Sequence, residues 1–369
     1  MGDRKMFGMP VEMLVSALLG ALFTAGLALT TIARANRRPP PATASSGDAD
    51  YAALLASLSA SSLRHRFDPF ADVDWDAAEH AVTPDDLRWV PTEGPLARTS
   101  WYRRQPLDRQ IAMGMWQQAN TAKIAMQFES MLIRGLVQYA SHMPNDSPEH
   151  HYCMHETIEE CNHVLMFQEL VNRIGFNVPG MPNWMRWLSP LIPLYAGPFP
   201  NVFFFGVLAG EVPVDVIQTR ALRNPGSTHP LVEKIMAIHV AEEARHISFA
   251  DAHLRRRVPN ARWINRVWMS IYVPVVMRVL AQPIVVPPRR FCRQFHVPRS
   301  VRKQLRAGTP ESRQELSNTF ADIRMLCHDI GLMTVTGKMM WRLCNIGGPP
   351  SRYRSEPRRT FVPTSTTGG

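Results

Sequence analysis

This chain has few cysteines, so little disulfide or thiolate chemistry is expected of it. Its 369 residues include only five cysteines, an odd number, and no two of them form a Cys-x-x-Cys pair. They stand at Cys153, Cys161, Cys292, Cys327 and Cys344. Cysteines spaced this widely favour neither a disulfide framework nor a thiolate zinc site. We therefore expect a reducing compartment.

Several enzyme signatures are also missing. The chain has no glycine-rich phosphate loop and no strand-turn-helix nucleophile elbow, and one short motif that occurs twice is its only recurrence. These absences exclude P-loop phosphate chemistry, hydrolases of the nucleophile-elbow type and solenoid repeats. Apolar residues make up 45% of the chain and charged residues 20%, which is typical of a folded globular protein.

Basic residues are concentrated in two segments. Residues 286–307 carry seven Lys or Arg and no acid, while residues 346–369 carry four Arg against Glu356, and together they account for the net charge of +10. No nucleic-acid-binding signature accompanies these arginines, so nucleic acid is not expected as a partner. A polybasic segment also suits anionic lipid headgroups.

The first 49 residues are expected to lie outside the folded domain. Residues 13–33 are uncharged and rich in Leu, Ala and Gly, and their number is close to the ~20 that a helix needs to cross a bilayer. They form a candidate N-terminal transmembrane helix. Pro39-Pro40-Pro41 and the small polar residues after it predict a linker.

Two other interpretations of residues 13–33 compete, a secretory signal peptide and a start codon placed too far upstream. The signal peptide conflicts with a reducing compartment, and no Met between Met13 and Met113 offers a later start. More positive charge follows the segment than precedes it, which keeps the domain on the cytoplasmic side. We expect membrane association with that orientation, and the alternative is a cytoplasmic protein.

Apolar residues recur at helical spacing over four long stretches. These are residues 107–143, 147–174, about 188–222 and 228–258, and further helices are expected at 262–279 and 310–344. Ser147 before Pro148 predicts an N-cap, and Ser227/Thr228 before Pro230 predicts another. The fold class is thus all-α, with a domain over residues 50–345 and a disordered basic tail over residues 346–369.

The second and fourth of these helices each contain the motif Glu-x-x-His, at Glu160/His163 and at Glu243/His246. Positions i and i+3 lie about 60° apart around a helix, so one carboxylate and one imidazole can bind the same metal ion. A single such motif is commonly an exposed pair. Two copies on facing helices predict two metal ions.

The other two long helices each offer one glutamate in an apolar stripe, Glu129 and Glu211. A buried carboxylate is costly unless it is paired or bound to a metal. A Glu from each of two helices plus a Glu-x-x-His from each of the other two is the donor set of ferritin-like di-metal bundles. We therefore predict a ferritin-like four-helix bundle with additional helices around it.

His239 is a seventh candidate ligand, because it shares a helical stripe with Glu243 and His246. A core or surface histidine on that face is the alternative. Other nearby acids and histidines are expected to lie on solvated faces or to be partners of ligands. They are Glu149, His150, His151, His155, Glu156, Glu159 and Glu242.

This donor set resembles the AurF-type family, the p-aminobenzoate N-oxygenases, whose members use four Glu and three His around two irons. The segment from Arg66 to Trp75 is similar to the family's opening region, and the resemblance covers about residues 50–345. It implies a non-haem di-iron oxygenase with two iron ions per chain and O2 as co-substrate. The implied metal ligands are Glu129, Glu160, His163, Glu211, His239, Glu243 and His246.

The reaction class remains open at the level of sequence. Oxygen transfer to an amine is what the resemblance implies, with a di-iron hydroxylase or desaturase acting on a lipid or carrier-bound acyl chain as the alternative. Iron oxidation and storage is an alternative of another class. Expected partners are a small organic substrate and an external electron donor such as a ferredoxin or a reductase, and a homodimer is left open.

Overall fold

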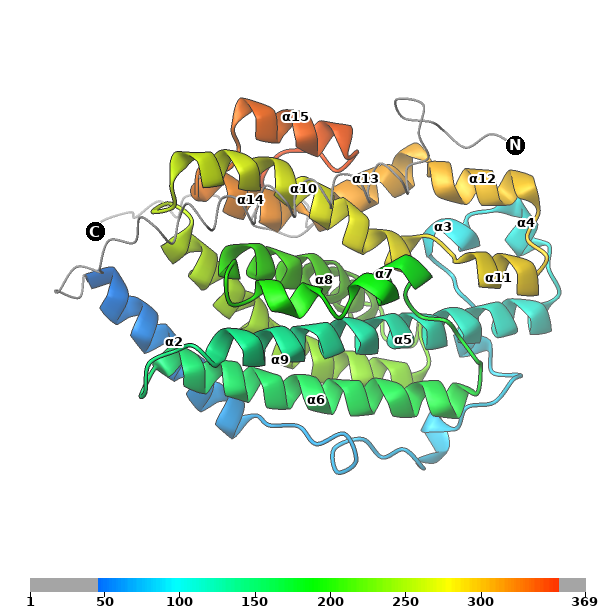
Figure 1. Ribbon diagram of the computed structural model, residues 1–369. Coiled ribbons are helices and arrows are strands. Elements are labelled where there is room, and N and C mark those ends of the chain that lie inside the picture. Colours follow the sequence, from blue (N-terminus) through cyan, green and yellow to red (C-terminus); the bar gives the residue numbers. More distant parts are fainter. Residues whose placement is uncertain (1–45, 352–369) are drawn as a thin grey trace, which may run out of the picture. The chain divides into compact units, whose positions relative to one another are not determined.

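The computed structural model describes residues 46–351, and within them every regular element is a helix (Figure 1). Residues 1–49 and 50–369 form two compact units. The predicted transmembrane helix at residues 13–33 lies outside the described residues, as does the predicted tail from residue 352 onward.

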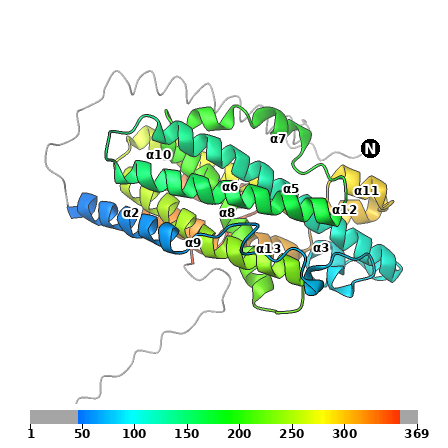
Figure 2. The same cartoon turned by 90° about the horizontal axis from the view of Figure 1, so that it is seen from below.

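Four long helices form the core of the second unit. They are α5 (Leu107–Ala140), α6 (Pro148–Ile174), α8 (Pro200–Leu222) and α9 (Pro230–Arg257). α5 packs along α6 and α8 along α9, and the two pairs contact each other through α5 with α8 and α6 with α9 (Figures 1 and 2). The result is a four-helix bundle.

Shorter elements surround this bundle. Before it come α2 (Ser46–Arg64), η1 (Ala78–His80), η2 (Leu87–Trp89), α3 (Gly94–Ala97) and α4 (Ser100–Arg103). Between its halves lie α7 (Asn183–Leu188) and η3 (Ile192–Tyr195), and after it come α10 (Trp263–Val285), α11 (Arg289–Gln294), α12 (Arg299–Ala307), α13 (Pro310–Thr319), α14 (Ala321–Asp329) and α15 (Val335–Leu343). α10 packs on α8 and carries α15.

Local sequence explains several helix ends. The Ser147 side chain accepts a hydrogen bond from the His150 backbone N–H, so the predicted N-cap of α6 is confirmed. α6 ends at Ile174 and is followed by Gly175, whose φ of 77° is the left-handed conformation that glycine adopts without strain. The predicted cap of α9 is wrong by one or two residues, because His229 occupies that position and its ring accepts from the Leu231 N–H.

Three predicted helices are wrong in extent. The third long helix was expected from about residue 188, but α7 ends there. Prolines at 190, 193, 198 and 200 then separate the short η3 from α8, which begins at Pro200. The stretch 310–344 is three helices instead of one, with breaks at Phe320 and after Asp329. By contrast, α10 continues through Pro274 and Pro283, six residues beyond the predicted end at 279.

The folded body extends past the predicted boundary at residue 345. Ile346 is fully buried, and the buried Arg324 guanidinium donates to the carbonyl oxygens of Ile346 and Pro349. The first part of the predicted tail is therefore part of the domain.

Two glycines set the approach of α5 to α8. A Cβ at Gly135 on α5 would lie 2.1 Å from the Phe203 ring, and a Cβ at Gly210 on α8 would lie 2.9 Å from the Phe128 ring. Each helix thus presents a bare backbone to an aromatic ring of the other. Phe203, Phe204 and Phe205 lie in the apolar core, so they pack the helices together.

By length and composition, two described segments could cross a membrane, Pro200–Leu222 and Trp263–Gln294. The most apolar part of Pro200–Leu222 is 72% buried within the protein, and this helix carries Glu211 in the bundle, as expected of a core helix. The most apolar part of Trp263–Gln294 is 53% buried.

Candidate metal centre

The bundle brings all seven predicted ligands together. Their donor atoms form two groups, Glu129/His163/His239/Glu243 and Glu160/Glu211/Glu243/His246, and within each group the donor atoms lie within 4.8 Å of one another. Every one of these side chains is buried. Glu243 belongs to both groups, so its carboxylate lies between them.

Helix geometry explains this convergence. α6 supplies Glu160 and His163 one turn apart, and α9 supplies His239, Glu243 and His246 along one stripe. α5 and α8 each supply one glutamate. On α5, α6 and α9 the donors stand between two apolar clusters, one built around Trp116, Phe167 and Ile235 and the other around Leu136, Phe204 and Phe249. The polar layer is thus enclosed by apolar layers along the bundle axis.

Ring nitrogens and carboxylates face each other inside the site. In the first group, His239 Nε2 lies 3.2 Å from both Glu129 Oε1 and Glu243 Oε1. In the second, His246 Nδ1 lies 2.8 Å from Glu160 Oε1. Nδ1 of His163 lies 3.4 Å from Glu160 Oε2 and 3.6 Å from Glu243 Oε1.

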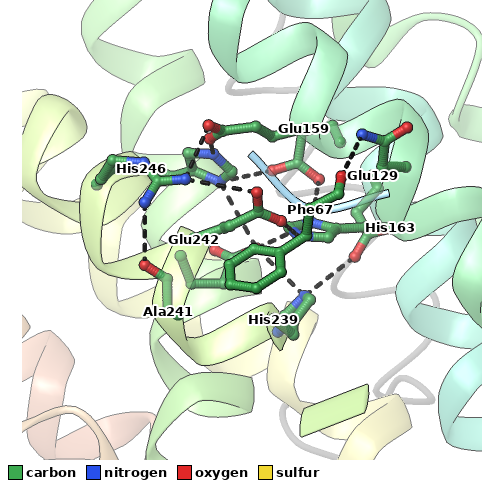
Figure 3. Close-up of polar contacts among 12 residues, drawn as sticks. Phe67, Glu129, Glu159, His163, His239, Ala241, Glu242 and His246 are labelled. Carbon is green, nitrogen blue, oxygen red and sulfur yellow. Dashed lines mark hydrogen bonds and ion pairs between the residues drawn. The ribbon is translucent and has the colours of Figure 1, made fainter. Parts of the chain in front are cut away.

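Each histidine is held by its other ring nitrogen. His163 Nε2 lies 2.9 Å from Glu242 Oε2, and His246 Nε2 lies 2.8 Å from Glu159 Oε2, so each motif histidine is paired with a carboxylate of the opposite helix (Figure 3). Arg245 bridges the two carboxylates, at 2.8 Å from Glu159 and 3.5 Å from Glu242. Glu159 and Glu242 are therefore partners of the predicted ligands, one of the two roles expected for them.

The sequence pattern did not predict which residue contacts His239. Its Nδ1 lies 2.8 Å from Gln218 Oε1, which makes Nδ1 the protonated nitrogen and leaves the lone pair of Nε2 for the site. Gln218 stands seven residues after Glu211 on α8, two turns along the same face. That spacing is the signal by which it could have been recognised.

Burial and charge shape the ionisation of the site. Burial, together with the Glu160 carboxylate, raises the pKa of Glu129 well above its usual range. Burial lowers the pKa of His239 to about 4, so this ring is neutral at pH 7. For His163 and His246 burial favours the neutral ring, but the surrounding carboxylates outweigh it and raise both pKa values.

The site fits divalent metal ions. Within the described part of the chain, both oxygens of Glu211, Oε2 of Glu129 and Oε2 of Glu243 are buried without a hydrogen-bond partner. Unpartnered buried oxygens of this kind are costly unless a cation binds them. Carboxylates and imidazoles together form a donor set for iron or manganese.

Comparison with known proteins agrees with this geometry. A family model described as P-aminobenzoate N-oxygenase AurF matches residues 48–331. Two curated relatives, the uncharacterized proteins Rv0885 of Mycobacterium tuberculosis (strain ATCC 25618 / H37Rv) and Mb0909 of Mycobacterium bovis, are each 55% identical over 316 residues, which is 85% of this chain and 93% of the relative. No solved structure matches the chain.

Proposed function

Because the chain belongs to the AurF family of p-aminobenzoate N-oxygenases, we propose that it is a non-haem di-iron oxygenase that transfers oxygen from O2 to an amine or a similar small organic substrate. One observation carries this proposal: two groups of buried donors share Glu243 and leave carboxylate oxygens unpartnered. The order of the donors along four packed helices supports a ferritin-like core.

In this proposal the seven side chains of the two groups hold two iron ions. When bound, the irons supply the electrons that activate O2. The residues around them have separate tasks. Glu159, Glu242 and Arg245 hold the imidazoles of His246 and His163 in place. Gln218 keeps the proton of His239 on Nδ1, and the apolar layers above and below exclude water.

A small cavity lies beside the centre. It is lined by Phe67, Pro69, Asn162, His163, Met166, Ile238 and Glu242. The Asn162 side chain donates to the Phe67 carbonyl oxygen at 2.9 Å, which holds the segment after α2 over this opening. The cavity measures about 10 Å³, which is room for about one water molecule, so it is an opening toward the centre and not a substrate pocket.

The reaction needs an external electron donor. Transfer of one oxygen atom from O2 with reduction of the other to water consumes two electrons and two protons per turnover, and the substrate gains only the oxygen. The described cysteines are all free thiols, and no Cys-x-x-Cys pair exists to store electrons. A ferredoxin or a reductase is therefore the proposed partner.

Single-turnover oxygenation tests this function. The reduced, iron-loaded protein is mixed with ¹⁸O2 and panels of aryl amines and fatty acyl compounds, and products are read by mass spectrometry. The proposal expects one labelled oxygen on an amine nitrogen. A labelled hydroxyl on carbon, or an unlabelled alkene, supports the hydroxylase or desaturase instead, and an iron load far above two per chain supports storage.

We also propose that the protein associates with an anionic membrane. Besides residues 13–33, the α7–η3 region exposes a run of apolar side chains, Trp184, Trp187, Leu188, Leu191, Ile192 and Leu194, of which Trp187 is 84% exposed. Met185 of α7 packs inward near Ile284 of α10, and the basic helices α11 and α12 follow α10 directly. Exposed tryptophans and a basic segment both suit a bilayer surface. The cytoplasmic protein remains the alternative.

A further inference from the structure

Glu156 is a buried carboxylate with no assigned task. It stands on α6 one turn before Glu160, its side chain is fully buried, and within the described residues neither of its oxygens has a hydrogen-bond partner. The Tyr152 hydroxyl, one further turn back on α6, is also buried and unpartnered. An unpaired carboxylate in such a position is costly to keep.

The surroundings of Glu156 are those of the second donor group. The charged groups that act on it most strongly are His246 and Glu243 of α9 and Glu160 and Glu159 of α6, and Glu156 in turn acts on Glu211 of α8. The one guanidinium at the site, that of Arg245, is already bonded to Glu159 and Glu242. Of the groups that act most strongly on Glu156, only His246 can carry a positive charge, and His246 is itself a member of the second donor group.

Even without Glu156, the two donor groups differ in their numbers of imidazoles and carboxylates. The first contains two imidazoles and two carboxylates, and the second contains one imidazole and three carboxylates. Glu156 lies outside both groups of closely spaced donors, one helical turn before Glu160 of the second group on the same face of α6. Its addition would make that site richer still in hard oxygen donors.

On the basis of the proposed function, we propose that Glu156 is a further carboxylate ligand of the metal held by Glu160, Glu211, Glu243 and His246. It provides one of its two free oxygens to this ion alone. The consequence is an asymmetric pair, in which one metal has a mixed nitrogen and oxygen environment and the other is bound almost wholly by carboxylates.

Anaerobic Fe(II) titration of the full-length protein tests this assignment. Wild type is expected to bind two ions in two steps. Glu156→Gln, which keeps the shape and removes the charge, should weaken one step by about ten- to a hundred-fold and leave the other unchanged. Glu169→Gln, on the same helix but paired with Arg173 away from the centre, is the matched control and should bind like wild type.

A second variant separates ligation from mere charge. Glu156→Asp keeps the negative charge but shortens the reach, so a ligand role predicts that the same step weakens again. ⁵⁷Fe Mössbauer spectra should show one of two iron environments changed and the other retained. If Glu156→Asp binds both ions like wild type, or if Glu156→Gln leaves both steps intact, the assignment is overturned. If wild type itself fails to bind two ions, the proposed function fails instead.

Discussion

Each histidine of the centre presents one nitrogen to the carboxylates because a protein group holds the other. For His239 that group is the Gln218 amide oxygen, 2.8 Å from Nδ1. This contact fixes the tautomer in which Nε2 carries a lone pair. His239 is the third histidine among the grouped donors, so its partner matters for the proposed assignment.

We predict that Gln218→Leu weakens Fe(II) binding by about ten- to a hundred-fold, because His239 loses the acceptor that orients it. Anaerobic titration measures the change. Gln282→Leu, at an exposed position of α10, is the control and should have no effect. Unchanged binding in Gln218→Leu would show that His239 does not depend on this contact for its role.

A second residue-scale prediction concerns Glu149, which is buried near the start of α6. It accepts hydrogen bonds from Tyr51 and Tyr139 at 2.8 Å each and contacts His253 Nδ1 at 3.1 Å. Burial would raise its pKa, but the contacts with His253 and the two tyrosines outweigh this and lower the pKa to about 2. The ionised carboxylate therefore ties α2 to the bundle.

Since the folded pKa is below the unfolded one, Glu149 stabilises the protein above about pH 4.5, and this contribution is lost as the pH falls toward 2. We predict that Glu149→Gln lowers the free energy of unfolding by up to about 3 kcal/mol at pH 7, and that the difference from wild type disappears near pH 2. Denaturant unfolding across this range measures it. A difference independent of pH would contradict the assigned cause.

The sequence predicts seven candidate ligands, which the structure brings together, and includes Glu159 and Glu242 among the expected partners, but it does not show which ligand each of them contacts and it misses Gln218. The ligands share a face of their own helix, and helical spacing makes such a face visible in one stretch of sequence. The contacts Glu159 with His246 and Gln218 with His239 join two different helices. Which residues meet across helices depends on packing, which a single sequence does not display.

At the scale of elements, the separation of α5 and α8 decides how far apart Glu129 and Glu211 lie. Phe128 and Gly210, which precede these glutamates in the chain, are in contact across the two helices, and Gly135 faces Phe203 in the same way. We predict that Gly135→Ala destabilises the protein by about 1–3 kcal/mol through overpacking and also lowers metal retention. Thermal unfolding and iron content measure the two effects.

Gly206→Ala is the matched control, because a Cβ at this α8 position meets nothing within 4 Å. It should stabilise slightly through helix propensity. Equal effects of the two substitutions would refute the close approach of α5 and α8.

Element boundaries were the weakest part of the sequence-based fold. Residues 188–210 are almost entirely apolar, so composition gave no reason to divide them, and only the prolines marked the ends of α7 and η3. α10 shows the opposite case, because it continues through two prolines while packing on α8 and α15. Tertiary contacts decide which prolines end a helix.

At the scale of the whole molecule, residues 1–49 and 50–369 are separate compact units, and all the candidate ligands belong to the second. We predict that deletion of residues 1–45 leaves a folded protein with the same iron content, because none of the contacts described for the centre involves the deleted part. Cell fractionation should find the full chain with membranes. A full chain with an intact N-terminus in the soluble fraction would contradict the proposed localisation.

The central claim is that two irons are held by donors that meet at Glu243. Iron per chain, measured after anaerobic loading and desalting of wild type and Glu243→Ala, tests it most directly. Since Glu243 belongs to both donor groups, the account predicts about two irons in wild type and fewer than one in the variant, with unchanged helicity by circular dichroism. Two tightly held irons in Glu243→Ala, or none in wild type, would contradict it.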